Sequence, residues 1–147
     1  MRTVKAILAS LGIGTYVTRS ELESGFLSFL DQAGLTRPEV NAHLLVGGRW
    51  VECDCVWRGR RVIVELDGRA VHGTAAAFER DRARDRMFTA RGWRLVRITW
   101  RQLHEDPDAV ASDLRTILAT RPQLPSNFAI AASATAPSRS RLHPPRS

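Results

Sequence analysis

The first amphipathic pattern along the chain begins at Ser20, where apolar residues recur three and four positions apart, as on one side of a helix. Ser20 is the predicted N-cap, and Glu23, three residues later, would complete a capping box with it. Gly34 and Pro38 are expected to end this helix. Its apolar side would consist of Phe26, Phe29, Leu30 and Ala33.

Three stretches with strand patterns follow, over residues 39–46, 49–57 and 61–67. Gly47-Gly48 separates the first two, and a turn around Gly59-Arg60 separates the second from the third. Both turns fit two-residue β-hairpins, which would fix the register of the strands. The pairs of opposed residues would be Asn41 with Asp54, His43 with Glu52, Asp54 with Glu65, and Glu52 with Asp67.

This register sorts the side chains onto two faces, because opposed residues of an antiparallel pair project to the same side. One face would collect Asn41, His43, Glu52, Asp54, Glu65 and Asp67. The other face would be apolar throughout: Val40, Ala42, Leu44, Val51, Cys53, Cys55, Trp57, Val62, Val64 and Leu66. A slip of one residue would put acids into the core, so the sorting supports the register and predicts a carboxylate cluster in the middle of the sheet.

The C-terminal half predicts a helix, a strand and a helix. Thr74 is the expected N-cap of a helix that ends near Gly92, and a strand over residues 93–100 follows. Asp106 as N-cap and Pro107 at the first helical position begin the last helix. The order is therefore α-β-β-β-α-β-α, which is an α/β fold.

Arginines dominate the helix after Thr74. Arg80, Arg84 and Arg91 share one side of a helical projection and could hold a DNA backbone, although a solvated ridge is the default reading of such a charge pattern. The other side carries Asp81 and Asp85 with Phe78 and Phe88, and we expect it to face the protein. The two aspartates are interpreted as partners of arginines such as Arg97 or Arg82.

Length and composition suit one globular domain with a core. Of 147 residues, 44% are hydrophobic and 25% are charged. We assign residues 1–19 to an N-terminal segment, 20–120 to the domain, and 121–147 to a basic tail rich in Pro, Ser, Ala and Arg that is expected to be disordered. The tail holds four arginines and no acid, so the net charge of +7 alone is weak support for nucleic acid binding.

No apolar run is long enough to cross a bilayer, so we expect no membrane contact and a cytoplasmic location. The only cysteines, Cys53 and Cys55, are spaced for neither a disulfide framework nor a Cys-x-x-Cys metal pair. Both are expected to be buried thiols in a reducing compartment.

The carboxylate cluster needs a positive partner. Phosphodiester hydrolysis uses a hard divalent cation that lowers the pKa of an attacking water, and carboxylate oxygens are suitable ligands for it. The alternative for Asp54 and Glu65 is neutralisation by arginine, with Arg60, Arg97 and Arg80 as candidates.

At this point the sequence resembles a known superfamily. The element order with Asp54 and Glu65-x-Asp67 resembles the PD-(D/E)XK nucleases and, within them, the endonuclease-like domains related to the very-short-patch-repair (Vsr) enzymes. The resemblance covers roughly residues 20–118. It is carried by Ser20-Glu21-Leu22-Glu23, the Asp54 strand, Val64-Glu65-Leu66-Asp67-Gly68, His72, residues 79–86 and Gly92-Trp93-Arg94-Leu95-Val96-Arg97.

The resemblance implies a restriction-endonuclease-like core, a mixed four-stranded sheet flanked by helices. It also implies Mg²⁺ or Mn²⁺ held by Asp54, Glu65 and Asp67. The superfamily's usual lysine is replaced here by Asp67, as in the Vsr-like branch, in which a histidine matching His72 takes part in catalysis. His72 would orient or deprotonate the water, and Glu23 could complete the site from the first helix.

Each of these roles has a structural alternative. Asp67 could accept hydrogen bonds from the turn at Gly68, Glu23 could serve only the capping box, and His72 could be a helix-entry or DNA-contacting residue.

The resulting expectation is a metal-dependent DNA endonuclease, with DNA repair as one setting and the oligomeric state left open. The first alternative is a non-catalytic DNA-binding or antitoxin-like module that retains the nuclease fold. The second is a degenerate or truncated relative, since related chains often carry a further N-terminal region.

Overall fold

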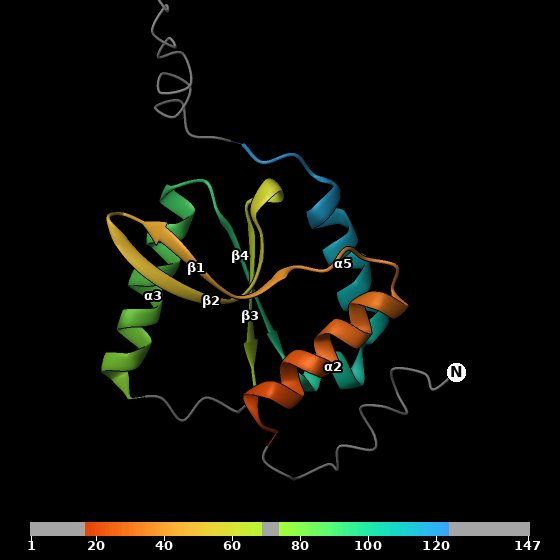
Figure 1. Ribbon diagram of the computed structural model, residues 1–147. Helices are drawn as coiled ribbons and strands as arrows, with labels where there is room; N and C mark the ends of the chain where they lie inside the picture. Colours follow the sequence, from red (N-terminus) through yellow and green to blue (C-terminus); the bar gives the residue numbers. More distant parts are fainter. Residues whose placement is uncertain (1–16, 69–73, 124–147) are drawn as a thin grey trace, which may run out of the picture.

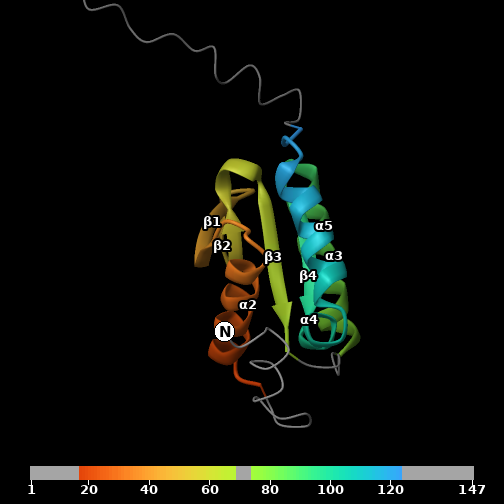
Figure 2. The ribbon, with the colours of Figure 1, turned by 90° about the vertical axis from the view of Figure 1, so that its right-hand side faces the viewer.

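A computed structural model describes residues 17–68 and 74–123 of the chain. It shows a single sheet of four strands with helices on both sides (Figures 1 and 2). The strands lie in the order β1-β2-β3-β4, with β1–β2 and β2–β3 antiparallel and β3–β4 parallel, as expected for a mixed sheet. The elements are α2 (Arg19–Gln32), β1 (Glu39–Val46), β2 (Arg49–Trp57), the 3₁₀ turn η1 (Arg58–Arg60), β3 (Val62–Asp67), α3 (Ala75–Ala90), β4 (Arg94–Thr99), α4 (Trp100–Glu105) and α5 (Pro107–Ala119).

The first hairpin has the predicted register. His43 pairs with Glu52, and Val46 pairs with Arg49 across the turn. Gly47 and Gly48 have φ of 59° and 74°, the left-handed values that a tight two-residue hairpin turn of this kind requires and that glycine adopts without strain.

The second hairpin has the predicted register but a different turn. Cys55 pairs with Val64 and Trp57 with Val62, although the connection is η1 followed by Arg61 at φ 52° rather than a two-residue turn. Beyond the Cys55–Val64 pair, the amide of Leu66 donates to Oδ2 of Asp54 at 2.8 Å. The carboxylate of Asp54 therefore accepts from the β3 backbone at the point where the β2–β3 pairing ends.

The prediction of a single apolar face is wrong. Cys55 packs with α2, α4 and α5 on one side of the sheet, while Cys53 packs with α3 on the other. Neighbouring odd-numbered residues of one strand therefore lie in different cores, and the alternation breaks beside Asn41, which has φ 51°. Because helices cover both sides, apolar residues are needed on both faces.

The N-caps of two helices were predicted correctly: Thr74 begins α3, and Asp106 followed by Pro107 begins α5. The first helix is capped instead by Thr18, whose capping-box partner is Glu21 rather than Glu23. Glu23 is therefore not used by the cap.

Two further expectations were wrong, the end of the last strand and the burial of Phe78. The predicted strand stops at Thr99, and a short helix, α4, begins there with a Thr99–Gln102 capping box. Phe78 does not face the protein, because it is 51% exposed, whereas Phe88 is fully buried.

His72 and the residues of the tail beyond 123 lie outside the described residues. Both cysteines are buried and free, as predicted. Among the described helices, none has the length and apolar character needed to cross a membrane.

Candidate active site

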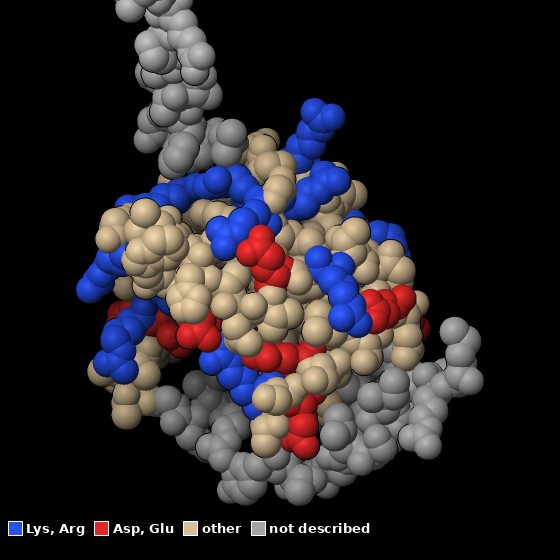
Figure 3. Space-filling model, in the orientation of Figure 1, with Lys and Arg blue, Asp and Glu red and all other residues tan. Residues whose placement is uncertain are grey.

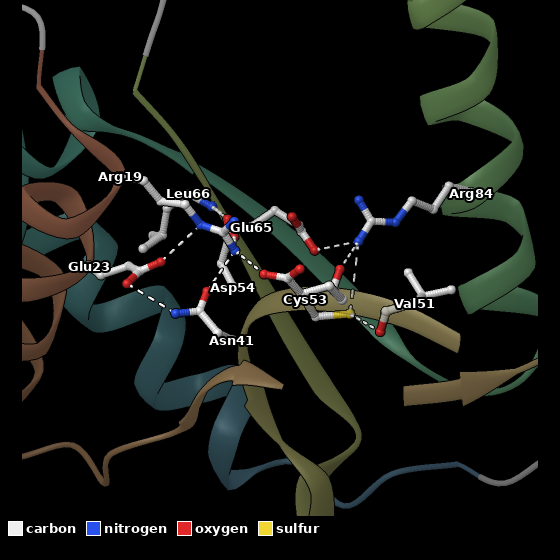
Figure 4. A network of polar contacts seen from close by, with 10 residues as sticks. Arg19, Glu23, Asn41, Val51, Cys53, Asp54, Glu65, Leu66 and Arg84 are labelled. Atoms are coloured by element: carbon white, nitrogen blue, oxygen red, sulfur yellow. Dashed lines mark hydrogen bonds and ion pairs between the residues drawn. The ribbon is translucent and has the colours of Figure 1, made fainter. Parts of the chain in front are cut away.

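One network of polar contacts, the Arg19 cluster, lies where α2 approaches β1 and β2 (Figure 4). It consists of Arg19, Glu23, Asn41, Glu52 and Asp54. From the first turn of α2, Nε of Arg19 donates to Glu23 at 3.0 Å. Its Nη2 lies 3.1 Å from Oδ1 of Asp54 and 2.7 Å from Oε1 of Glu52. One guanidinium thus neutralises carboxylates from a helix and a strand.

Asn41 belongs to the same cluster. Its Oδ1 accepts from Arg19 Nη2 at 2.6 Å, and its Nδ2 donates to Glu23 Oε2 at 3.3 Å. Asn41 is among the few residue types that tolerate a left-handed backbone, and its φ of 51° accompanies this double contact. The predicted gathering of Asn41, Glu52 and Asp54 on one face is confirmed, whereas Glu65, predicted on the same face, is bound from the α3 side.

Glu65 is held from the opposite side of the sheet. Arg84, from α3, donates through Nη2 to Glu65 Oε1 at 3.0 Å and to the Glu52 carbonyl at 2.7 Å. The same guanidinium lies over the Phe88 ring, 5.5 Å from its centroid, and its Nε is buried without a hydrogen-bond partner among the described residues. In Figure 4, α2 and Arg19 lie on one side of Glu65, and α3 and Arg84 lie on the other.

Burial distinguishes Glu65 from the other acids. Only 11% of its side chain is exposed, and burial raises the pKa of Glu65 to about 7. The charge of Arg84 acts in the opposite direction, while the nearby negative charge of Asp54 adds to the increase. The two carboxylates are therefore close enough to influence each other.

Asp67, at the end of β3, lies near a second group of charges. Burial raises its pKa, the Arg97 guanidinium acts against that shift, and Asp54, Asp81 and Asp85 add to it. Arg97 itself donates to Asp85 at 2.9 Å, and Arg82 lies 3.5 Å from the same carboxylate. The interpretation of Asp85 as a partner of arginines such as Arg97 or Arg82 is confirmed, while for Asp81 the structure shows only a charge near Arg97.

The proposed arginine ridge is not a uniform exposed surface. Arg80 is exposed, but Arg84 turns toward the sheet and binds Glu65. Arg91 is partly buried, donates to the Met87 carbonyl and lies against Gly47 at the tip of the first hairpin. A helical projection places residues around the axis, and it cannot show which arginine meets an acid from the sheet.

The residues fit a hard divalent cation in chemistry but only partly in arrangement. Asp54, Glu65 and Glu23 supply oxygen donors, which Mg²⁺ and Mn²⁺ prefer. In the described residues, however, no three His, Cys, Asp or Glu side chains are grouped closely enough to hold an ion. Asp54 and Glu65 are instead bound to two different arginines, so an ion between them requires at least Arg19 to leave Asp54.

The alternative to metal ligation, neutralisation of these acids by arginine, is therefore seen in the described residues, but through Arg19 and Arg84 and not through Arg60, Arg97 or Arg80. Arg19 was missed because its contacts with Asn41, Glu52 and Asp54 span 22 to 35 positions of sequence. Only its contact with Glu23, four residues along the helix, has a local signal.

Comparison with known proteins identifies the class. The chain belongs to the restriction-endonuclease-like family REase_MTES_1575, whose model matches residues 26–118, more than half of the chain. The matched segment contains Asp54, Glu65, Asp67 and Arg84, and it begins after Arg19 and Glu23.

The fold is similar to a solved structure titled Homing Endonuclease I-Bth0305I Catalytic Domain, with a TM-score of 0.50 and 17% sequence identity. The similarity covers 65% of this chain and 90% of that one. No curated protein matches the sequence. Family and fold together place the chain in the nuclease superfamily.

Proposed function

We propose that the protein is a metal-dependent DNA endonuclease. Asp54 and Glu65 would hold Mg²⁺ or Mn²⁺, Asp67 would complete the acidic set, and Glu23 would assist from α2. His72 is proposed to orient or deprotonate the attacking water. Asp67 in place of a lysine supports assignment to the Vsr-like branch.

One observation carries this proposal. The chain belongs to a restriction-endonuclease-like family, and two shielded carboxylates, Asp54 on β2 and Glu65 on β3, lie on its adjacent strands. Side-chain exposure is 17% for Asp54 and 11% for Glu65. Shielded acids are costly unless they are compensated, which is typical of sites where charge has a function.

When bound, the cation would supply charge neutralisation at the phosphate and a more acidic water. The protein's own residues would then do the positioning. The Leu66 amide fixes one oxygen of Asp54, which leaves Oδ1 as the atom that Arg19 now occupies. Arg84 holds Glu65 Oε1, and its charge favours the ionised form of Glu65 that ligation requires.

A second function is favoured by a specific observation. Arginines already neutralise Asp54 and Glu65, so the two carboxylates need no metal ion to balance their charge. A non-catalytic DNA-binding or antitoxin-like module would show the same pairing.

Cleavage of supercoiled plasmid and of mismatched duplex tests the two functions. Wild type, Asp54→Ala and Glu65→Ala are incubated with Mg²⁺, Mn²⁺ or EDTA, and Asp108→Ala, an exposed acid at the start of α5, is the matched control. Metal-dependent nicking that both site variants lose and the control keeps supports the enzyme. DNA binding without nicking by the wild type would favour the module.

A further inference from the structure

The tip of the β1–β2 hairpin carries an exposed apolar pair. Leu45 and Trp50 are directly opposed across the strands, and their exposed fractions are 60% and 69%. Most large apolar side chains in the described structure are buried, and an exposed tryptophan with an exposed leucine beside it forms a flat apolar surface.

This pair lies on the sheet face that carries the Arg19 cluster. Residues two apart in a strand project to the same side, so Trp50, Glu52 and Asp54 share a face, and Glu52 and Asp54 both contact Arg19. The intervening Val51 and Cys53 pack into the core on the α3 side. Four residues of strand, roughly 13 Å, separate Trp50 from Asp54.

Arginines lie near the tip. Arg49 precedes Trp50 and is exposed. Arg91, at the end of α3 on the other side of the sheet, has its guanidinium within 2.8 Å of where a side chain at Gly47 would begin. Arg58, which follows the far end of β2, pairs with Glu39 and also donates to the His43 carbonyl. In Figure 3 the surface over the hairpin, at the upper left, is tan and bordered by blue side chains.

We propose that Trp50 is a stacking platform for an unpaired DNA base next to the candidate active site. An indole face on a rigid strand with the exposed Arg49 next to it in sequence suits a base and its phosphates, since stacking accepts any base and arginine holds the backbone. The inference rests on the proposed DNA substrate, but it does not require cleavage.

A second copy of the chain fits this surface less well. Two side chains offer roughly 300 Å² of apolar area, whereas a stable interface buries about 800 Å² on each partner. The bordering positive charge would also repel an identical surface, while it attracts a polyanion.

The test is binding of a short fluorescein-labelled single strand, and of the same sequence in a fully paired duplex, measured by fluorescence anisotropy in EDTA. Trp50→Ala should weaken single-strand binding about tenfold, and Trp50→Phe should keep most of it. Duplex binding should change less than about threefold, because the bases of a duplex already stack on one another. The matched control is Phe78→Ala, which removes an aromatic side chain of similar exposure from α3.

Three results would overturn the inference: unchanged single-strand binding by Trp50→Ala, an equal loss for duplex, or a wild type that binds neither strand form. A concentration-dependent dimer in sedimentation that Trp50→Ala abolishes would assign the surface to a second copy instead. Circular dichroism verifies that each variant is folded. Because cleavage plays no part, this inference and the endonuclease proposal can fail separately.

Discussion

The two carboxylates of the candidate site are held by arginines in different ways. Arg19 is 57% exposed and shares its charge among Glu23, Glu52 and Asp54. Arg84 is 27% exposed and packs on Phe88, and Glu65 is the carboxylate that it binds among the described residues. Exposed ion pairs contribute little and exchange readily, whereas breaking a buried pair leaves a charge without compensation. The Arg19 pairing is therefore the displaceable one, and the Arg84 pairing is structural.

The largest expected effect on stability comes from Arg84. At pH 8, Arg84→Gln should lower the free energy of unfolding by about 2 kcal/mol, since Glu65 keeps its buried position and loses its partner. Urea denaturation measures this. The double variant with Glu65→Gln should recover part of the loss, and Arg101→Gln, from the exposed pair with Glu105, should change stability by less than about 0.5 kcal/mol. Equal effects of Arg84→Gln and Arg101→Gln would contradict a structural role for the Arg84–Glu65 pair.

Glu65 should also give the metal-free protein a pH dependence. Its pKa is raised from 4.5 to about 7 in the folded state, so below pH 4.5 both states are protonated and no stability is lost. Between pH 4.5 and 7 the unfolded chain releases the proton and the folded one keeps it. Stability therefore falls as pH rises, by up to about 3 kcal/mol.

Glu65→Gln should remove this fall, so the difference between variant and wild type in urea denaturation should grow with pH. The Asp108→Ala variant is the control, because its carboxylate is exposed. A constant difference between pH 4 and pH 8 would show that folding leaves the pKa of Glu65 unchanged.

Much of the fold follows from local pattern, and the limits of that pattern are instructive. Glycine turns fixed both hairpin registers, including Cys55 with Val64, even where the turn itself differs. The sides of the sheet could not be predicted in the same way, because Asn41 interrupts the alternation and helices cover both faces.

Two helix starts show a similar limit. Thr18 with Glu21 and Ser20 with Glu23 both match the capping-box pattern, and packing selects the first. Thr99 with Gln102 matches it too, a signal that could have revealed α4. In the candidate site, the acids could be identified from the sequence. The contacts of Arg19 and the orientation of Arg84 toward the sheet could not, because both depend on residues distant in sequence.

Displacing Arg19 should have a smaller effect on stability and a visible one on metal binding. Arg19→Gln should change the free energy of unfolding by less than about 1 kcal/mol, because 57% of the Arg19 side chain is exposed and its ion pairs are screened by water. Without the competing charge at Oδ1 of Asp54, the affinity for Mn²⁺ should rise roughly fivefold in calorimetric titration. Arg37→Gln, from an exposed pair with Asp31, is the control, and equal affinities in all three proteins would contradict the competition.

The smallest effect concerns the two cysteines that flank Asp54. Burial raises the pKa of Cys53 to about 11 and that of Cys55 to about 12, so both thiols should be almost entirely protonated at pH 8. Iodoacetamide should modify them slowly in the native protein and rapidly in urea. Fast labelling of either thiol in the native state would show that the sheet opens near Asp54.

The central claim is that Asp54 and Glu65 share a divalent cation once Arg19 has moved. Electron paramagnetic resonance of Mn²⁺ titrated into wild type, Asp54→Asn and Glu65→Gln at pH 8 tests it most directly. We predict one ion bound per wild-type chain and at least a tenfold loss of affinity in each variant, on the order expected for loss of a charged ligand. Undiminished binding in both variants, or no Mn²⁺ bound by wild type with DNA present, would contradict it.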